Sequence, residues 1–310
     1  MKLKKVLVTG GAGLLGKSII PLLLKKHYSV VALDINESKI PKVKFIKGNF
    51  NDKEMINKLL KDMDVVIHLA AMLGVDECRL SPEKVMKVNY QDTKTLIESC
   101  ISNNVKKFIF TSSSEVYGNS LSIPYREDNL TTPVSTYGKS KVMVEEYLKE
   151  VANNSKMKVG IVRLFNVYGY YQRKSFVVPM FIEAALKDKP LIIFGDGTQT
   201  RSFTYVTDAA RGIIKFLDYD GRYEIVNIGR NKEYTVNDLA RVIFKNLPNS
   251  KSIIKYVKYG SKNVRDISLE IKRRVPSVEK AKNLFNFSAK TSLEDGVREI
   301  VIQIEKNKIF

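Results

Sequence analysis

Hydrophobic residues in this chain gather in short runs, and between the runs they recur every three or four positions. Short apolar runs are typical of buried parallel strands, and the longer periodic segments are typical of amphipathic helices that cover a sheet. Because the two kinds alternate up to residue 169, the pattern predicts an α/β fold with a doubly wound parallel sheet of the Rossmann type. The expected strands lie at 6–8, 30–33, 43–46, 65–71, 108–110 and 159–165.

The regular alternation stops after Gly169, although helices and strands continue. We therefore expect two lobes. The Rossmann domain comprises residues 1–169 and 203–230, and a smaller α/β C-terminal lobe, comprising 170–202 and 231–310, binds the substrate. Within the first lobe, two long helices are expected at 81–103, after a serine cap and a proline, and at 133–153.

A glycine-rich turn links the first strand to the first helix and gives the clearest local chemistry. Gly10 permits the tight turn, Gly13 lets backbone N–H groups approach a pyrophosphate, and Gly16 lets the helix pack close to the strand. Asp34 ends the second strand, where a carboxylate accepts hydrogen bonds from a ribose 2′-hydroxyl and repels a 2′-phosphate. The unit predicts a dinucleotide site that prefers NAD to NADP.

The chain has 310 residues and a formal net charge of +19, which raises the question of nucleic-acid binding. Its lysines are scattered over many predicted helices, without a basic run interleaved with aromatic residues. We therefore favour a solvated, lysine-rich surface without nucleic-acid binding. The charge still favours anionic substrates such as nucleotide diphosphates.

The lengths of the apolar runs and the placing of the cysteines and of His68 predict a cytoplasmic protein with no metal site. No apolar run approaches the roughly 18 residues of a membrane span, so no membrane association is expected. Cys78 and Cys100 lack metal-ligand spacing and are interpreted as reduced, buried thiols. His68 lies inside a predicted strand without a partner His or Cys, which favours a core histidine over a catalytic base.

Tyr137 and Lys141 lie one turn apart on the second long helix. A nearby ammonium favours the phenolate, so this pair can exchange a proton with a sugar or alcohol hydroxyl. Ser113 follows a central strand, where it can hydrogen-bond the same oxygen. Such a pair is also common by chance on helix surfaces, but the glycine turn ahead of it favours alcohol oxidation with a nicotinamide cofactor.

With these features, the sequence resembles the extended short-chain dehydrogenase/reductase family, and specifically its NAD-dependent nucleotide-sugar epimerases, dehydratases and decarboxylases. The resemblance covers nearly the whole chain. The matching motifs lie at residues 9–16, 68–71, 89, 111–118, 137–141, 163–169 and 195–208.

The resemblance implies that Tyr137 is the base, that Lys141 holds the cofactor ribose and lowers the tyrosine pKa, and that Asn166 and Arg201 contact the substrate diphosphate. For Arg201, a surface salt bridge is the alternative. A homodimer through helices 81–103 and 133–153 is also implied. The other residues implied to bind NAD are Leu14, Leu15, Asn49, Leu69, Ala70, Ala71, Asn89 and Thr111, and those implied to lie near the substrate are Leu73 and Gly74.

The resemblance leaves the reaction that follows oxidation at C4 of the sugar open. Residues 113–115 place Ser114 where sugar dehydratases of the deoxythymidine type carry an aspartate, and the Ser-Glu pair resembles GDP-mannose dehydratases and UDP-glucuronate decarboxylases instead. Glu115 either abstracts a proton or braces its loop. Epimerisation, dehydration, decarboxylation of a UDP-glucuronate-like substrate and net 4-dehydrogenation all remain, as does a catalytically silent NAD-binding scaffold. Also open is which of Arg265, Arg273 and Arg274 reaches the diphosphate.

Overall fold

A seven-stranded parallel sheet forms the centre of the computed structural model, which describes residues 4–120, 122–258 and 271–307. Its strand order, β11-β6-β5-β4-β1-β2-β3, confirms the predicted doubly wound α/β fold. Because β1 lies between β2 and β4, the order reverses there, and ligands bind at the carboxyl ends beside such a point. The strands are β1 (Lys5–Thr9), β2 (Ser29–Asp34), β3 (Lys44–Lys47), β4 (Val65–His68), β5 (Lys107–Ser113), β6 (Lys158–Leu164) and β11 (Tyr223–Ile228).

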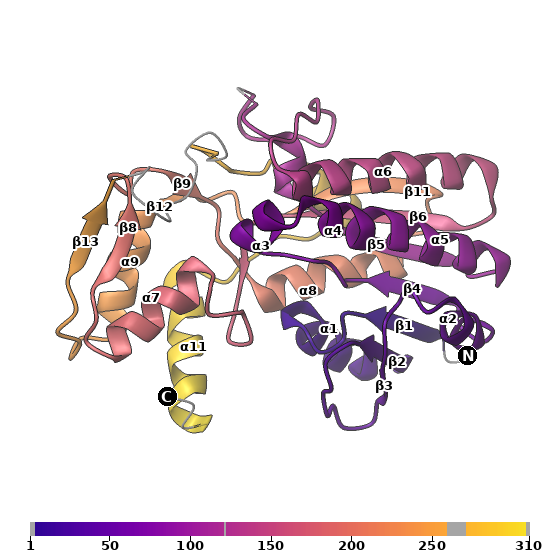
Figure 1. Ribbon diagram of the computed structural model, residues 1–310, viewed down its shortest axis with the longest axis horizontal. Coiled ribbons are helices and arrows are strands. Elements are labelled where there is room, and N and C mark those ends of the chain that lie inside the picture. Colours follow the sequence, from indigo (N-terminus) through magenta and orange to yellow (C-terminus); the bar gives the residue numbers. More distant parts are fainter. Residues whose placement is uncertain (1–3, 121, 259–270, 308–310) are drawn as a thin grey trace.

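Helices cover both faces of the sheet (Figure 1), so its strands are buried on both sides. One face carries α1 (Leu14–Lys25), α8 (Val206–Ile214) with the short 3-10 helix η3 (Lys215–Leu217), and α10 (Glu279–Phe285). The other face carries α2 (Lys53–Leu60), α5 (Thr93–Ser102) and α6 (Thr136–Asn154).

The first of the two predicted long helices differs from the expectation. Ser81 makes no capping hydrogen bond, and it separates α3 (Val75–Leu80) from α4 (Pro82–Met86). The helix then widens into a π-helix, η1 (Lys87–Asp92), before α5. Side-chain periodicity does not reveal such a local widening, which is common at functional sites. The second helix, α6, is continuous and is capped by Ser135, whose hydroxyl accepts from the N–H of Gly138 at 3.0 Å.

The structure confirms that His68 is a core histidine. It is 1% exposed, and its two ring nitrogens hydrogen-bond the hydroxyls of Thr9 at 2.7 Å and Thr93 at 3.1 Å. Burial, followed by the charge of Lys141, lowers the pKa of the imidazole to about 3. The ring is therefore neutral at physiological pH and joins β1, β4 and α5.

A second hydrophobic cluster lies beside the sheet (Figure 1). It is built from the helices α7 (Val177–Leu186), α9 (Val236–Asn246) and α11 (Leu293–Asn307). Residues of the predicted substrate lobe also occur elsewhere, because α10 packs on the sheet; the lobe boundaries stay a prediction. The small strand pairs of this region are β8 (Leu191–Phe194) with β13 (Ile254–Val257), β9 (Thr200–Arg201) with β12 (Tyr234–Thr235), and β7 (Val167–Tyr168) with β10 (Thr204–Tyr205).

Two findings bear on other classes of protein. Among the described residues, no helix combines the length and the apolar character that crossing a bilayer requires. The same part of the chain contains no group of three or more His, Cys, Asp or Glu side chains that could hold a metal ion.

Candidate active site

The glycine turn between β1 and α1 leaves almost no room for side chains at two of its positions. Gly10 has φ of +74°, and a Cβ there would lie 2.7 Å from the backbone nitrogen of Ala70. A Cβ on Gly16 would lie 2.5 Å from the carbonyl oxygens of Gly10 and Gly11. Gly13 is different: the nearest atom to its Cβ position is the Gly10 oxygen, at 3.3 Å. The space before the first turn of α1 therefore fits a pyrophosphate, which that helix end favours.

This difference gives a matched pair of variants. Gly16→Ala forces backbone atoms apart, which costs about 1–3 kcal/mol in folding stability, and it also weakens NAD binding. Gly13→Ala meets one tight contact, with the Gly10 oxygen at 3.3 Å, so we expect it to lower NAD affinity with a smaller loss of stability than Gly16→Ala. Urea unfolding and calorimetric titration with NAD measure the two effects. Equal losses of stability in the two variants would contradict this account of the turn.

Asp34 lies at the end of β2, beside the glycine turn. One carboxylate oxygen accepts from the N–H of Ala12 at 3.0 Å, and the other accepts from the N–H of Asn36 at 2.9 Å. This arrangement holds the acid next to the pyrophosphate space, where a ribose of the cofactor would lie. Asn49, also expected at the adenosine end, follows β3 and accepts from the N–H of Asn51 at 3.3 Å.

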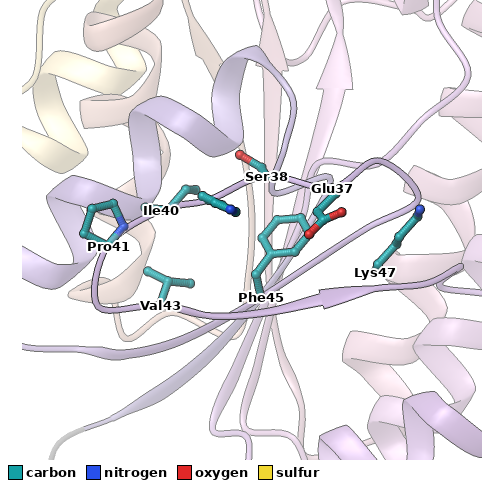
Figure 2. A pocket seen from close by; sticks show the side chains of 8 residues that line it. Glu37, Ser38, Ile40, Pro41, Val43, Phe45 and Lys47 are labelled. Carbon is teal, nitrogen blue, oxygen red and sulfur yellow. The ribbon is translucent and has the colours of Figure 1, made fainter.

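A surface pocket of about 410 Å³ lies beyond Asp34, in the connection between β2 and β3 (Figure 2). Apolar Val43 and Phe45 line it on one side and Ile40 lies across from them, with Lys47 at one end. None of the described residues predicted to bind NAD lines this pocket, which is therefore distinct from the cofactor cleft.

The segment after β4 passes directly over the glycine turn. The N–H of Leu69 bonds the carbonyl of Thr9 at 3.1 Å, and the backbone of Leu69 and Ala70 packs against Gly10. Contact of Leu69, Ala70 and Ala71 with NAD stays a prediction. The side-chain amide of Asn89, on the π-helix, hydrogen-bonds both backbone groups of Met72. Its oxygen accepts from the Met72 N–H at 2.7 Å, and its nitrogen donates to the Met72 carbonyl at 3.0 Å. In this structure Asn89 therefore shapes the loop that leads to Leu73 and Gly74.

Tyr137 and Lys141 project from the first two turns of α6 toward the carboxyl end of β5. Tyr137 is half-buried, and Ser113 lies near enough to its phenol to influence its pKa. Burial raises the pKa of its phenol above the usual value, and the charges of Glu115 and Cys78 raise it further. The hydrogen bond from Ser113 and the cation of Arg274 oppose that rise. The phenol therefore needs further help to act as a base near neutral pH.

Lys141 is 2% exposed, and its ammonium donates to the carbonyl of Thr111 at 2.9 Å. The nitrogen lies 5.6 Å from the centre of the Tyr137 ring and 4.5 Å from that of Phe110. Burial lowers the pKa of this amine to about 7, although Glu145 and Cys78 oppose the shift. The charge of Arg274 opposes the rise of the Tyr137 pKa, and the influence of Lys141 on that phenol stays a prediction.

The lowered pKa of Lys141 predicts a pH dependence of stability. Above pH 7 the folded protein has released this proton, while the unfolded chain keeps it up to its pKa near 10.4. The free-energy cost of burying the charged amine is therefore complete below pH 7, and it declines as the pH rises from about 7 to about 10.4. Lys141→Met removes this cost, so its stabilising effect should be larger at pH 6 than at pH 9. Urea unfolding without cofactor at both pH values measures it, and an equal effect would contradict the assignment.

Ser113, Ser114 and Glu115 lie where β5 passes into the short 3-10 helix η2 (Ser114–Tyr117). One oxygen of Glu115 accepts a hydrogen bond from the hydroxyl of Ser135, the cap of α6, at 2.6 Å. This contact is the bracing role that the sequence left open. The other oxygen lies 3.7 Å from Arg274 Nη1, so it faces the candidate site, where proton abstraction stays a prediction.

Arg274 is the residue that sequence reasoning left undecided and that the structure brings into the site. Its side chain is 12% exposed, and among the described residues its Nε is buried without a hydrogen-bond partner. Arg273 instead binds Glu233 in an exposed pair at 2.7 Å, and Arg265 lies outside the described residues. The two neighbouring arginines were visible in the sequence. Neighbours in extended backbone point to opposite sides, so only the fold decides which one faces inward.

Asn166 and Arg201, expected at the substrate diphosphate, lie close to the backbone that carries Arg274. Asn166 has φ of +35°, and its amide donates to the carbonyl of Ser202 at 3.4 Å. The N–H of Ser202 in turn bonds the carbonyl of Arg274 at 3.1 Å. Arg201 donates to the Thr200 carbonyl at 2.8 Å. Burial raises the pKa of the nearby Tyr125 phenol, and the charges of Arg274 and Arg201 oppose that rise. The fold therefore gathers these polar residues, far apart in sequence, on one side of the cleft.

The doubly wound sheet, the glycine turn with its acid and the Tyr137–Lys141 pair define a dinucleotide-dependent enzyme of the dehydrogenase/reductase class. The profile of the NAD-dependent epimerase/dehydratase family matches residues 6–229. The chain belongs to that family and has the extended short-chain dehydrogenase/reductase fold. It is an NAD-dependent enzyme that modifies nucleotide sugars, which confirms the predicted class, cofactor and general function.

Individual relatives cover nearly the whole chain. A putative UDP-glucose 4-epimerase of Methanocaldococcus jannaschii is 35% identical, over 97% of this chain and 99% of its own length. A UDP-N-acetyl-alpha-D-glucosaminuronate decarboxylase of Bacillus cytotoxicus is 32% identical, over 96% and 97%. The crystal structure of a UDP-glucuronic acid 4-epimerase from Bacillus cereus, with UDP-glucuronic acid and NAD, superposes with a TM-score of 0.87 at 31% identity, over 98% and 99%.

Proposed function

We propose that this enzyme acts on a UDP-linked uronic acid, through oxidation at C4 of the sugar. The observation that carries the proposal is Arg274, an inward-facing guanidinium beside Glu115 and Tyr137 with an unpartnered, buried Nε among the described residues. A carboxylate on C5 of the sugar lies next to the C4 hydroxyl, and a guanidinium is the preferred partner of such a group. Two of the relatives above also carry the name of a uronic acid.

The proposed chemistry begins with a proton transfer at the C4 hydroxyl. Tyr137 accepts that proton, Ser113 hydrogen-bonds the same oxygen, and Arg274 orients the sugar by its carboxylate. The glycine turn and Asp34 fit NAD, with Lys141 on the nicotinamide side. When bound, NAD supplies the acceptor for the hydrogen that leaves C4 with its electron pair.

The site also restricts what can follow. Oxidation at C4 makes the C5 proton acidic, and it makes a C5 carboxylate part of a β-keto acid that can lose carbon dioxide. Glu115 lies beside Arg274 and is the candidate for moving the C5 proton. We propose decarboxylation, whose C5 carbanion needs a proton, or epimerisation at C4, which needs none at C5. Dehydration does not fit the proposed substrate, because a sugar whose C6 is a carboxylate has no C6 hydroxyl to lose as water. We further propose a cytoplasmic homodimer that pairs α6 and the α4–η1–α5 helix and serves polysaccharide biosynthesis.

A panel of substrates tests this proposal. UDP-glucuronate and UDP-galacturonate are compared with UDP-glucose and UDP-galactose, with NAD present and products identified by NMR. We expect kcat/KM to favour the acids by at least about thirtyfold, the lower end for a buried charge pair. Equal or better turnover of the neutral hexoses would overturn the choice of substrate. Bound NAD without turnover of any sugar would support the silent scaffold instead.

A further inference from the structure

A buried ion pair lies directly behind the candidate catalytic residues. Glu145 is on α6, two turns beyond Tyr137, and its carboxylate binds the guanidinium of Arg163 on β6 at 2.6 Å. The side chains are 5% and 4% exposed. Ser112, next to Ser113 on β5, also donates to Glu145. The pair therefore fixes the catalytic helix to two central strands.

Hydrogen bonds continue from this ion pair across the molecule. Nη1 of Arg163 donates to the hydroxyl of Tyr117 at 2.9 Å, and that hydroxyl donates to the side-chain oxygen of Asn227 at 2.7 Å. The amide nitrogen of Asn227 then donates to the carbonyl of Tyr125 at 3.0 Å. Tyr117, Tyr125 and Asn227 are each fully buried, and the two tyrosine rings stack at 4.8 Å. No step of this sequence of bonds is exposed to solvent.

Tyr125 in turn holds the segment that carries Arg274. We call residues 272–277 the strap. The N–H of Tyr125 bonds the carbonyl of Val275 at 2.9 Å, and the N–H of Ser277 bonds the carbonyl of Tyr125 at 2.8 Å. The hydroxyl of Tyr125 lies between two carbonyl acceptors, that of Gly118 at 3.0 Å and that of Arg273 at 3.3 Å, so it shares its proton between the end of η2 and the strap. Both backbone groups and the side chain of one residue therefore fix the strap.

The opposite edge of the strap binds the loop that carries Arg201. The N–H of Thr200 bonds the carbonyl of Lys272 at 3.0 Å, and the N–H of Ser202 bonds that of Arg274 at 3.1 Å. The strap therefore lies between Tyr125 and residues 200–202. Through the strap, the same hydrogen-bonded path reaches both arginines that face the substrate side.

Stability alone is a weak explanation for such an arrangement. Buried ion pairs are often replaced by apolar residues at little or no cost, because removing the charges from water offsets their attraction. Buried polar groups do demand their partners, so a satisfied network permits one arrangement of the elements that it joins. Here the elements that it joins are the helix of Tyr137 and the strap of Arg274.

We propose that the path from Glu145 through Arg163, Tyr117 and Asn227 to Tyr125 is a positioning network, which sets Arg274 relative to Tyr137. None of these five residues touches the sugar; they act through the strap. The part of the inference that concerns substrate rests on the proposed function, because Arg274 holds a carboxylate only if the substrate is an acid. The part of the inference that concerns how the strap is held does not rest on the proposed function.

Tyr117→Phe tests the network with little change of volume, since it removes only the hydroxyl between Arg163 and Asn227. We expect KM for the UDP-uronic acid to rise about three- to tenfold, as for one lost buried hydrogen bond, with the affinity for NAD unchanged. Hydrogen exchange should become faster in the strap. Tyr168→Phe is the matched control, because it removes an equally buried hydroxyl that bonds Ser292 at 3.3 Å, outside the network.

A second variant covers the case in which Tyr117→Phe fails to fold. Tyr125→Phe removes the hydroxyl that is shared between the carbonyls of Gly118 and Arg273, and it should give the same rise of KM and the same faster exchange in the strap. If exchange in the strap and KM are the same in the network variants as in Tyr168→Phe, the network proposal is wrong. If the wild-type enzyme prefers neutral sugars but the strap still loosens, the proposed substrate is wrong and the network stands.

Discussion

Replacement of Tyr137 by phenylalanine should lower kcat for the nucleotide sugar by about 10²–10⁴-fold, the usual contribution of a general base. The ring remains, so the packing of α6 and the affinity for NAD should change little. The expected effect is large because the phenol is the group that Ser113 hydrogen-bonds and Arg274 influences. Turnover followed by NMR, with NAD affinity measured separately, distinguishes lost chemistry from lost binding.

Tyr147→Phe is a suitable control for this variant. Tyr147 is on the same helix, and its hydroxyl donates to Glu98 at 3.4 Å near the surface, away from the cleft. Its loss should leave kcat within about twofold of the wild-type value, as for most surface changes. If Tyr137→Phe turns over at the parent rate, another group takes the proton and the proposed mechanism is wrong.

The wild-type pH profile should agree with the same assignment. Burial and the neighbouring anions raise the pKa of the Tyr137 phenol, so its deprotonated form is scarce at neutral pH without the cofactor. The rate of a base-catalysed step should therefore increase with pH up to the apparent pKa of the complex. This rise should be absent in whatever activity Tyr137→Phe retains.

The parts of the site that the sequence predicted are those set by local spacing. The glycine turn, Asp34 and the pair of Tyr137 and Lys141 each belong to one continuous element, where strand and helix periodicity decides which residues share a face. The fold class followed from the same alternation, and the observed strand order confirms it. The predicted position of the cofactor rests on three glycines and one acid, which the fold brings to the same edge of the sheet.

The features that the sequence did not predict depend on contacts between distant segments. The inward position of Arg274 requires the strap to lie between Tyr125 and residues 200–202, about seventy residues or more away in the chain. The π-helix at Asn89 accompanies the two hydrogen bonds to Met72, which hydrophobic periodicity cannot show. Tertiary packing likewise decides which charges act on the Tyr137 phenol, because Arg274 comes from a distant segment of the chain.

Arg274→Gln should raise KM for a UDP-uronic acid by about 30-fold or more, because a buried partner of the carboxylate is lost. KM for a neutral UDP-hexose should change little. The preference of the enzyme for UDP-uronic acids over neutral UDP-hexoses, measured as the ratio of their kcat/KM values, should therefore decrease. Arg273→Gln is the matched control. Its guanidinium binds Glu233 at the surface, and substitution of the neighbouring residue keeps the strap and its sequence context almost unchanged.

The same variant also separates the two roles of the guanidinium. Arg274 lowers the pKa of the Tyr137 phenol, so its removal should shift the rise of the pH–rate profile toward higher pH with every substrate. The loss of carboxylate binding should appear only with acidic sugars. If acidic and neutral sugars lose activity equally, and high pH restores both, Arg274 acts only through Tyr137. A loss confined to the acids would instead assign the residue to the substrate carboxylate.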